Sequence, residues 1–300
     1  SASATSADAE KADDKYQAKV LRLGPSKESA LGVAVAVGLS DAELAAGLVK
    51  GEQAIVDEFK THGSSSDKAN LMYIMYGTAL KEEDMPHHVK DEIASMKYHG
   101  GSLEPDDFDF GHAGMTLADF LEHEYSRIAG LQRPHVLALR LYTASSYTCF
   151  NRPLRNEQKP HPFAMSVYFL ADAVKKLRAV AAELDPEGFM TEKVLWRGMQ
   201  DLTVDHDKFS REGGSERAPM STSSSISVAL NYAASKTPLV FKYKTRGNGR
   251  GVPISYLSMY PKEEEYLYPP LTLLVPEGPI QEHEYNGQVY KIIEVTPMMP

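Results

Sequence analysis

Residues 260–270 read YPKEEEYLYPP, and this stretch decides how the second half of the chain is interpreted. Side chains alternate between the two faces of a strand, so a strand that begins at Glu263 would direct Glu263 and Glu265 to one face and Glu264 to the other. Two carboxylates on one face repel each other, which is costly without a purpose. We therefore expect Glu263 and Glu265 to belong to a site, and Glu264 to be exposed without a chemical role.

The sequence on both sides of this stretch, from about residue 190 onward, has a composition typical of β-strands. Short runs of β-branched and aromatic residues alternate there with Gly, Ser and Pro, which favours strands separated by turns. The runs are KVLWR (193–197), PLVFKYK (238–244), EYLYPP (265–270), LTLLV (271–275) and VYKIIEV (289–295).

The chain before about residue 185 has mostly helical patterns. Ser40 and Glu43 form a Ser-x-x-Glu capping box, which predicts a helix that ends near Gly51. We expect further helices at 26–38, 67–81, 88–97, 116–129, 133–148 and 162–183. Helices followed by strands predict an α+β fold, a helical N-terminal half packed on a β-rich half.

Composition limits the classes of partner. The net charge is −9 and no long Lys/Arg cluster occurs, so we expect neither nucleic acid nor a membrane as a partner. Cys149 is the only cysteine, which excludes a disulfide within the chain and leaves the cytoplasm and secretion both open. Residues 1–16 are small and polar, and we expect a disordered leader there. We expect a monomer.

Two further motifs could carry chemistry. Leu195-Trp196-Arg197-Gly198 places an arginine at the end of a predicted strand, where it could grip a phosphate or simply be solvated. Residues 219–223 read PMSTS, and Ser221 follows Arg197 by 24 positions. These hydroxyls could cap the next helix, or Ser221 could hold a carboxylate in place. Neither motif decides between its alternatives when taken alone.

The order Arg197, Ser221-Thr222-Ser223, Glu263-x-Glu265 resembles the R-S-E group of ADP-ribosyltransferases, which includes arginine-specific vertebrate ecto-enzymes and bacterial actin-modifying toxins. Tyr260 matches the family's aromatic residue three positions before the first glutamate. Tyr232 fits the aromatic residue that packs on nicotinamide. The resemblance covers about residues 131–300, and a helical stretch at 141–155 adds to it.

The resemblance implies a helical half packed on a β-sandwich core, with NAD⁺ bound in a cleft between strands. It also implies roles for single residues. Glu265 would stabilise an oxocarbenium-like transition state and bind the ribose 2′-hydroxyl, Ser221 would hold Glu265, and Arg197 would bind the dinucleotide phosphates. Glu263 would orient an acceptor arginine and take its proton, beside Tyr260. The expected NAD contacts are Arg197, Gly198, Ser221, Thr222, Ser223, Tyr232 and Glu265.

The expected organisation is a leader (1–16), a helical region of unknown role (17–115) and an ADP-ribosyltransferase catalytic domain (116–300). The expected activity is transfer of ADP-ribose from NAD to a protein acceptor, at an arginine. The alternatives are an NAD glycohydrolase and a non-catalytic NAD-binding module. We expect no metal, because Asp106, Asp107 and Asp109 lack a calcium-loop pattern and resemble an acidic linker. The histidines at 87, 88, 112, 123 and 135 are assigned surface or capping roles.

Overall fold

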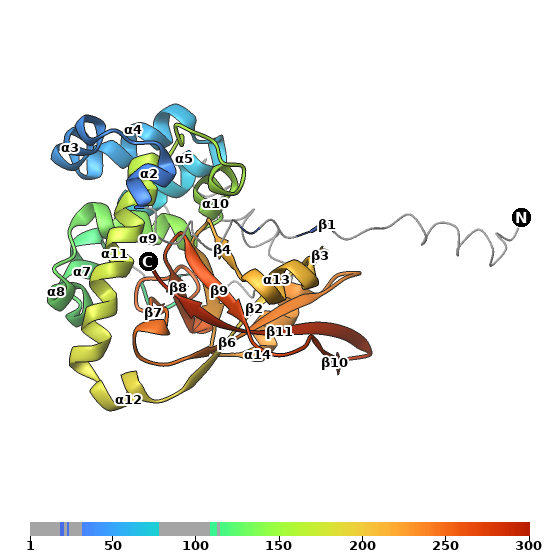
Figure 1. The fold of residues 1–300 in the computed structure, drawn as a ribbon. Helices are drawn as coiled ribbons and strands as arrows, with labels where there is room; N and C mark the ends of the chain where they lie inside the picture. The colour runs from blue at the N-terminus through green and yellow to red at the C-terminus, as the bar shows by residue number, and fades with distance from the viewer. Residues whose placement is uncertain (1–18, 21–22, 24–31, 78–108, 113–114) are drawn as a thin grey trace, which may run out of the picture.

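The computed structural model describes residues 19–20, 23, 32–77, 109–112 and 115–300. The predictions for the leader (1–16), the helix at 88–97 and the acidic residues Asp106 and Asp107 lie outside these residues. Figure 1 shows the helices of the first half gathered on one side of the molecule, and most of the strands, together with the short helices of the second half, on the other. This arrangement confirms an α+β fold with a helical first half and a β-rich second half.

The helices of the first half are α2 (Val33–Val37), α3 (Asp41–Lys50), α4 (Glu52–His62), α5 (Ser65–Met72), the π-helical turn η2 (Tyr73–Gly77), α7 (Leu117–Glu122), α8 (Glu124–Ala129), α9 (Arg133–Thr143), α10 (Tyr147–Arg155), α11 (Ala164–Leu184) and α12 (Pro186–Met190). The second half adds α13 (His206–Glu212), α14 (Ile226–Ala233) and the 3₁₀ turns η5 (Gly247–Gly249) and η6 (Pro261–Glu263).

The strands are β1 (Lys19–Val20), β2 (Lys193–Met199), β3 (Leu202–Thr203), β4 (Gly214–Glu216), β5 (Met220–Ser223), β6 (Leu239–Thr245), β7 (Val252–Pro253), β8 (Glu265–Tyr268), β9 (Thr272–Pro276), β10 (Gln281–Tyr285) and β11 (Gln288–Met298). Each of the five predicted runs contains or overlaps one of these strands.

The predicted helix that starts after Ser40 is confirmed with its cap. The Ser40 hydroxyl accepts from the Glu43 backbone N–H, the Glu43 carboxylate accepts from the Ser40 N–H, and the helix ends before Gly51. Three predicted helices are wrong in extent. The helix expected at 26–38 begins only at Val33, because Gly32 is extended (ψ 146°). The helix expected at 116–129 is divided into α7 and α8 because His123 is extended (ψ 140°). The helix expected at 133–148 ends at Thr143, and α10 begins after a short break.

Nine of the strands form one continuous sheet in the order β4-β9-β11-β6-β2-β5-β8-β7, with β10 paired to β11, and β1 and β3 pair in parallel as a separate two-stranded sheet. The larger sheet curls back on itself. Tyr243 of β6 stacks on Tyr268 of β8 with ring centroids 5.7 Å apart, although β2 and β5 separate these strands in the sheet. Rings on such strands meet only if two parts of the sheet face each other, as in a sandwich.

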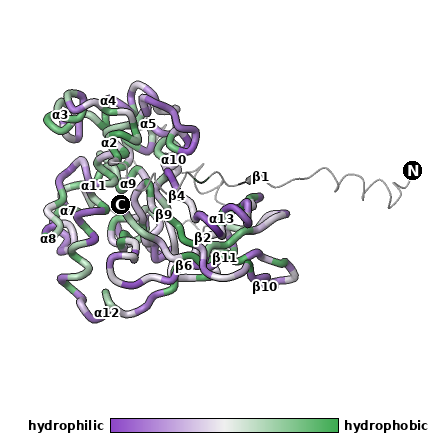
Figure 2. Tube along the Cα trace, in the orientation of Figure 1, coloured by the Kyte–Doolittle hydropathy of each residue, from purple (hydrophilic) through white to green (hydrophobic). Residues whose placement is uncertain are grey.

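The described residues form two large hydrophobic cores and a smaller cluster, in which Leu230 of α14 packs with Val240 of β6 and Ile292 of β11. The strand core lies inside the curled sheet around Phe241, Tyr243 and Tyr268. The helical core includes Phe59 of α4, Leu137 of α9 and Leu170 of α11, and it extends to Leu257 and Met259 beside the sheet. Helices on both sides of residue 116 therefore share one core. Figure 2 shows that apolar residues (green) recur along these helices, whereas the exposed strand β10 is largely polar (purple).

Within the described residues, none of the helices combines the length and the apolar character needed to cross a membrane. Cys149 is buried in the helical core, where it packs as a small residue.

Candidate active site

The three sequence motifs lie on three neighbouring strands, β2, β5 and β8. Ser223 of β5 pairs with Trp196 of β2 on one side and with Glu265 of β8 on the other. The segment with Arg197 and the segment with Glu265 are thus placed on either side of the Ser-Thr-Ser strand, although 68 positions separate them in the sequence (265 − 197). The sheet brings the motifs together as the sequence predicts.

Glu265 is the first residue of β8 and is 6% exposed. Its Oε1 accepts a short hydrogen bond from the Ser221 hydroxyl, and its Oε2 accepts one from the Ser258 hydroxyl at 3.2 Å. Burial raises the pKa of Glu265 to about 7. The negative charge of Glu263 acts in the same direction, while the two hydroxyls and the positive charge of Arg197 oppose it.

Glu263 does not lie on the strand, so the prediction that strand alternation begins there is wrong. Pro261 opens the turn η6, Glu264 follows in the left-handed conformation (φ 48°), and regular pairing starts only at Glu265. A left-handed residue reverses the chain locally and cannot continue a strand. The turn still leaves Glu263 close enough for its charge to raise the pKa of Glu265. Glu264 is exposed, as expected, and accepts from the Ser224 hydroxyl.

The carboxylate of Glu263 is hydrogen-bonded by a side chain of helix α14. The Tyr232 hydroxyl of α14 donates to Glu263 Oε1 at 2.7 Å, while the tyrosine as a whole is 52% exposed. Burial raises the pKa of Glu263, and the Tyr232 hydrogen bond partly offsets this. Burial beside the Glu263 charge also raises the pKa of Tyr232, so its phenol keeps its proton. The sequence predicts Tyr232 at the cofactor but gives no sign of its contact with Glu263.

Arg197 lies within β2, two residues before the strand ends. Its Nη1 donates to the backbone carbonyl of Ser221 at 2.8 Å, so the guanidinium reaches across to the strand that carries the Ser-Thr-Ser motif. Tyr260, which the resemblance assigns to acceptor binding, is half-buried at the start of the η6 turn. Burial raises the pKa of Tyr260 to about 12.

Gly198 allows helix α14 to approach strand β2. A Cβ atom at this position would lie 1.9 Å from the carbonyl oxygen of Ala229 and 2.8 Å from the backbone nitrogen of Ala233. Both atoms belong to the helix backbone, which cannot give way as a side chain does. The packing of α14 on β2 therefore requires glycine at this position, whether or not a ligand binds there.

The hydroxyls of Thr222 and Ser223 link β5 to residues 263–266 by hydrogen bonds to backbone carbonyls. Thr222 Oγ1 donates to the Tyr266 carbonyl at 2.9 Å, and Ser223 Oγ donates to the Glu263 carbonyl at 2.7 Å. The N-cap residue of α14, Ser225, makes no capping hydrogen bond with its own side chain, but its N–H donates to the Ser223 hydroxyl at 3.0 Å. The structure therefore has Ser221 in contact with a carboxylate and Ser223 in contact with the backbone at the start of the helix.

Sequence reasoning missed Ser258, because a serine between apolar neighbours in the run ISYLSMY carries no signal of its own. It also assigned Asp109 wrongly to an acidic linker. Asp109 is 6% exposed and binds the buried Arg140 with both carboxylate oxygens, at 3.0 and 2.9 Å. His112, expected at the surface or at a cap, is buried with Nδ1 2.8 Å from Asp109 Oδ1. Arg140, the partner of Asp109, is 31 positions away in the sequence, and no local pattern marks the contact between His112 and Asp109.

Of the other histidines that were assigned surface or capping roles, His87 and His88 lie outside the described residues, and His123 and His135 have the expected kind of role. His123 accepts from the Tyr125 N–H at the start of α8, and His135 accepts from the Gln132 N–H at the start of α9. Within the described residues, no group of three or more His, Cys, Asp and Glu side chains is arranged to hold a metal ion.

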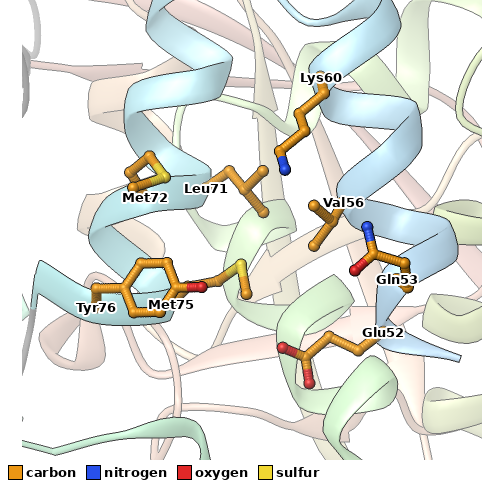
Figure 3. A pocket seen from close by; sticks show the side chains of 8 residues that line it. All are labelled: Glu52, Gln53, Val56, Lys60, Leu71, Met72, Met75 and Tyr76. Atoms are coloured by element: carbon orange, nitrogen blue, oxygen red, sulfur yellow. The ribbon is translucent and has the colours of Figure 1, made fainter.

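A separate cavity lies among the N-terminal helices, away from the three motifs. Figure 3 shows Val56 of α4 and Leu71 of α5 facing each other across it, with Lys60 at one end and Glu52 at the other. None of its lining residues belongs to the β2, β5 or β8 segments.

The sequence matches a known family over most of its length. The model of the NAD:arginine ADP-ribosyltransferase family matches residues 84–281. The chain therefore belongs to this family, whose members are NAD-dependent ADP-ribosyltransferases. No curated protein matches the chain.

Solved structures of ADP-ribosyltransferases are similar at low sequence identity. The eukaryotic mono-ADP-ribosyltransferase ART2.2, as a variant in complex with NAD, is 16% identical, with 93% of this chain and 95% of that chain covered and a TM-score of 0.49. The toxin Plx2a from Paenibacillus larvae is 19% identical over 61% of this chain and 94% of its own, with a TM-score of 0.43. HopU1 of Pseudomonas syringae is 21% identical over 61% and 88%, with a TM-score of 0.43.

Proposed function

We propose that this protein is a mono-ADP-ribosyltransferase of the R-S-E type that transfers ADP-ribose from NAD⁺ to an arginine side chain of another protein. The observation that carries the proposal is the buried carboxylate of Glu265, which has a serine hydroxyl on each oxygen and lies near the Arg197 cation. A carboxylate fixed in this way suits a reaction that develops positive charge on a sugar.

In the proposed reaction, the bond between ribose C1′ and the nicotinamide nitrogen breaks, and nicotinamide leaves with the bonding electrons. The ribose becomes oxocarbenium-like, and the ionised Glu265 stabilises this cation and accepts from the ribose 2′-hydroxyl. Ser221 keeps the carboxylate in place by its short hydrogen bond to Oε1. Burial is what makes the charge effective, because electrostatic interactions are stronger where water is excluded.

The acceptor requires a second carboxylate. An arginine guanidinium has a pKa above about 12 and is a poor nucleophile until it loses a proton. In the proposal, Glu263 orients the guanidinium and takes this proton as the new bond to C1′ forms. The raised pKa of Glu263 makes it a stronger base than an ordinary glutamate, which supports this assignment. Tyr260, three positions earlier, would contact the acceptor.

The remaining predicted residues are proposed to surround NAD⁺. Arg197 would bind the phosphates with its guanidinium, Tyr232 would pack its half-exposed ring on nicotinamide, and Thr222 and Ser223 would shape the strand that lies beneath the ribose. Gly198 would contribute backbone groups, in addition to its packing against α14. No metal has a part in this scheme.

We also propose that residues 116–300 form the catalytic unit and that the region 17–115 supports it structurally. Helices α4, α9 and α11 pack in one core, so the described helices of the N-terminal region contribute to the same interior as the catalytic half. Removing residues 1–115 tests this proposal. The truncated chain should unfold at lower temperature, and a folded truncated chain with increased transfer would favour autoinhibition instead.

The test of the proposed function is transfer of labelled ADP-ribose from NAD⁺ to an arginine-containing acceptor. Glu265→Gln should lower the transfer rate by about 10²–10³-fold, the usual effect of removing one group that stabilises transition-state charge. Glu263→Gln should abolish transfer and leave some NAD⁺ hydrolysis. Mass spectrometry should locate ADP-ribose on arginine.

Other outcomes favour the alternative functions. Release of free ADP-ribose at a rate that an arginine-rich acceptor does not change would indicate an NAD glycohydrolase. NAD⁺ binding by calorimetry without any product would indicate a binding module. Full transfer by both glutamate variants would refute the assignment of the site.

A further inference from the structure

Ser258 is a fully buried residue in the segment between β7 and β8, outside the three motifs. We propose that Ser258 is a positioning residue for Glu265, and that helix α9 anchors the backbone around Ser258 so that its hydroxyl cannot turn away from the carboxylate. This inference rests on the proposed function, because it matters for catalysis only if Glu265 stabilises the ribose cation.

The direction of the Ser258 hydroxyl follows from its two hydrogen bonds. Its oxygen accepts from the Tyr260 backbone N–H at 3.1 Å, and its hydroxyl donates to Oε2 of Glu265 at 3.2 Å. Because the backbone N–H can only donate, the Ser258 hydrogen is free to point at the carboxylate. With Ser221 on Oε1, Glu265 is then held at both oxygens, by two different segments of the chain. A carboxylate fixed at both ends cannot rotate about its terminal bond.

The backbone on either side of Ser258 is anchored to helix α9. Arg140 Nη1 donates to the Leu257 carbonyl at 2.9 Å, and the Met259 N–H donates to Thr143 Oγ1 at 3.1 Å. Leu257 and Met259 are both fully buried in the helical core. Each neighbour of Ser258 is therefore tied to α9 both by a hydrogen bond and by packing.

A second segment reinforces this anchor. The Asp109 N–H donates to the Met259 carbonyl at 2.7 Å, and the Asp109 carboxylate binds Arg140. The Ser258 N–H donates to the Ile254 carbonyl at 2.9 Å, which closes the turn itself. These contacts leave the serine no alternative position without breaking several buried hydrogen bonds, each costly to lose.

The expected effect of Ser258 on catalysis concerns the charge state of Glu265. A hydrogen bond donated to a carboxylate favours its ionised form, and the Ser258 contact lowers the pKa of Glu265 against the effect of burial. Removing the hydroxyl should therefore raise that pKa. At a given pH near neutrality, less of the enzyme would carry the negative charge that the ribose cation needs.

Of the other charged and titratable groups near Glu265, all but Glu263 keep their charge state through neutral pH. The other groups are Glu263 of the η6 turn, Arg197 of β2, Tyr142 of α9 and Tyr232 of α14. Burial raises the pKa values of both tyrosines, so they stay protonated through neutral pH. Arginine keeps its charge throughout this range. Only Glu263 can titrate together with Glu265.

The experiment compares Ser258→Ala with the unaltered protein in transfer of ADP-ribose to a small guanidino compound, from about pH 5.5 to about pH 9. The expected result is that the acid limb of log(kcat/KM) moves to higher pH. The rate deficit at about pH 6 should exceed that at about pH 8.5 by several-fold, with most of the loss in kcat. Ser224→Ala is the matched control, because the Ser224 hydroxyl binds the exposed Glu264, and its profile should not move.

The folded fraction of each variant is measured at both pH values, because folding itself depends on pH, and the rates are compared per folded protein. Ser258→Cys, which keeps the size and a weak donor, should give a profile between those of Ser258→Ala and the unaltered protein. If Ser258→Ala lowered kcat/KM by the same factor at all pH values, the positioning role would be wrong. It would also be wrong if Ser224→Ala shifted the pH profile as much as Ser258→Ala does. If the unaltered protein transfers nothing, or Glu265→Gln keeps full activity, it is the proposed function that fails.

Discussion

Glu265 lies opposite Ser223 in the ladder between β5 and β8, but its carboxylate accepts a hydrogen bond from Ser221, two residues earlier on β5. Diagonal neighbours across antiparallel strands are close enough for such a contact. Ser223 instead donates to the backbone carbonyl of Glu263. The two serines of one motif thus serve different glutamates. One holds the carboxylate on the strand, and the other holds the turn that carries the second carboxylate.

The buried charge of Glu265 should make the protein less stable at neutral pH than it would be without it. The pKa is raised from 4.5 to about 7 in the folded protein. Between these values the folded protein holds a proton that the unfolded chain has lost, so stability falls as pH rises through this range and stays lower above it. We expect Glu265→Gln to increase the free energy of unfolding by up to roughly 3 kcal/mol at about pH 8 and by little at about pH 4.5.

Urea denaturation at the two pH values measures this effect. Glu264→Gln is the matched control, because it removes the same charge from an exposed residue one position away. An increase that is equal at both pH values, or equal in both variants, would show that the charge of Glu265 is not what limits stability.

Gly198→Ala should disrupt the contact between α14 and β2. The added methyl would meet the Ala229 carbonyl at 1.9 Å, so the helix would have to move. Overpacking of this kind costs typically about 1–3 kcal/mol, and displacement of α14 would also move Tyr232 away from Glu263. Thermal unfolding and NAD⁺ binding measure the two effects. Gly32→Ala is the control, because no atom lies within 4 Å of its added methyl, and it should change neither quantity.

Much of the fold could be predicted because its signals are local. The aromatic and β-branched runs indicate the strands around Glu265 and Tyr243, and the capping box at Ser40 fixes the start of α3. The end of α9 could not be predicted in the same way. The residues after it are held by distant partners, since the Ser146 hydroxyl donates to Asp67 and accepts from Asn70.

The residues of the candidate site likewise differ in whether a local sequence pattern reveals them. Arg197, Ser221 and Glu265 are recognisable because their order forms a pattern within one sequence. Ser258 and Asp109 have no such pattern, and their roles depend on contacts that only the folded chain creates. The position of Glu263 was predicted on a strand because nothing in EEE marks the middle residue as left-handed. A polar residue takes that conformation here where the 3₁₀ turn ends.

The buried ion pair of Asp109 and Arg140 should be essential for stability. Arg140 has no exposure to solvent and also contacts the ring of Phe120, with the guanidinium carbon 4.5 Å from the ring centre. Asp109→Ala would leave its buried positive charge without a partner, which typically costs about 3–5 kcal/mol. Asp57→Ala, which breaks an exposed pair with Lys50, should cost far less, because solvent screens such a pair. Denaturant unfolding measures both, and similar losses would contradict the structural importance of the buried pair.

Tyr232→Phe separates two contributions of one side chain. The ring, proposed to pack on nicotinamide, is kept, while the hydroxyl that donates to Glu263 at 2.7 Å is lost. If Glu263 acts on the acceptor and not on NAD⁺, the variant should hydrolyse NAD⁺ with an unchanged KM but transfer ADP-ribose to arginine more slowly. We expect roughly a tenfold slower transfer, the scale of one hydrogen bond to a charged group.

Tyr232→Ala should instead impair both reactions, because it removes the ring as well. Tyr285→Phe, on the exposed strand β10, is the control for loss of a phenol elsewhere and should alter neither rate. Hydrolysis and transfer are measured in the same reaction as free and protein-bound ADP-ribose. A Tyr232→Phe variant with both rates reduced equally would mean that the hydroxyl acts before the acceptor is involved. The hydrogen bond to Glu263 would then contribute to the reaction of NAD⁺ itself. The proposal that Glu263 acts only on the acceptor would be wrong.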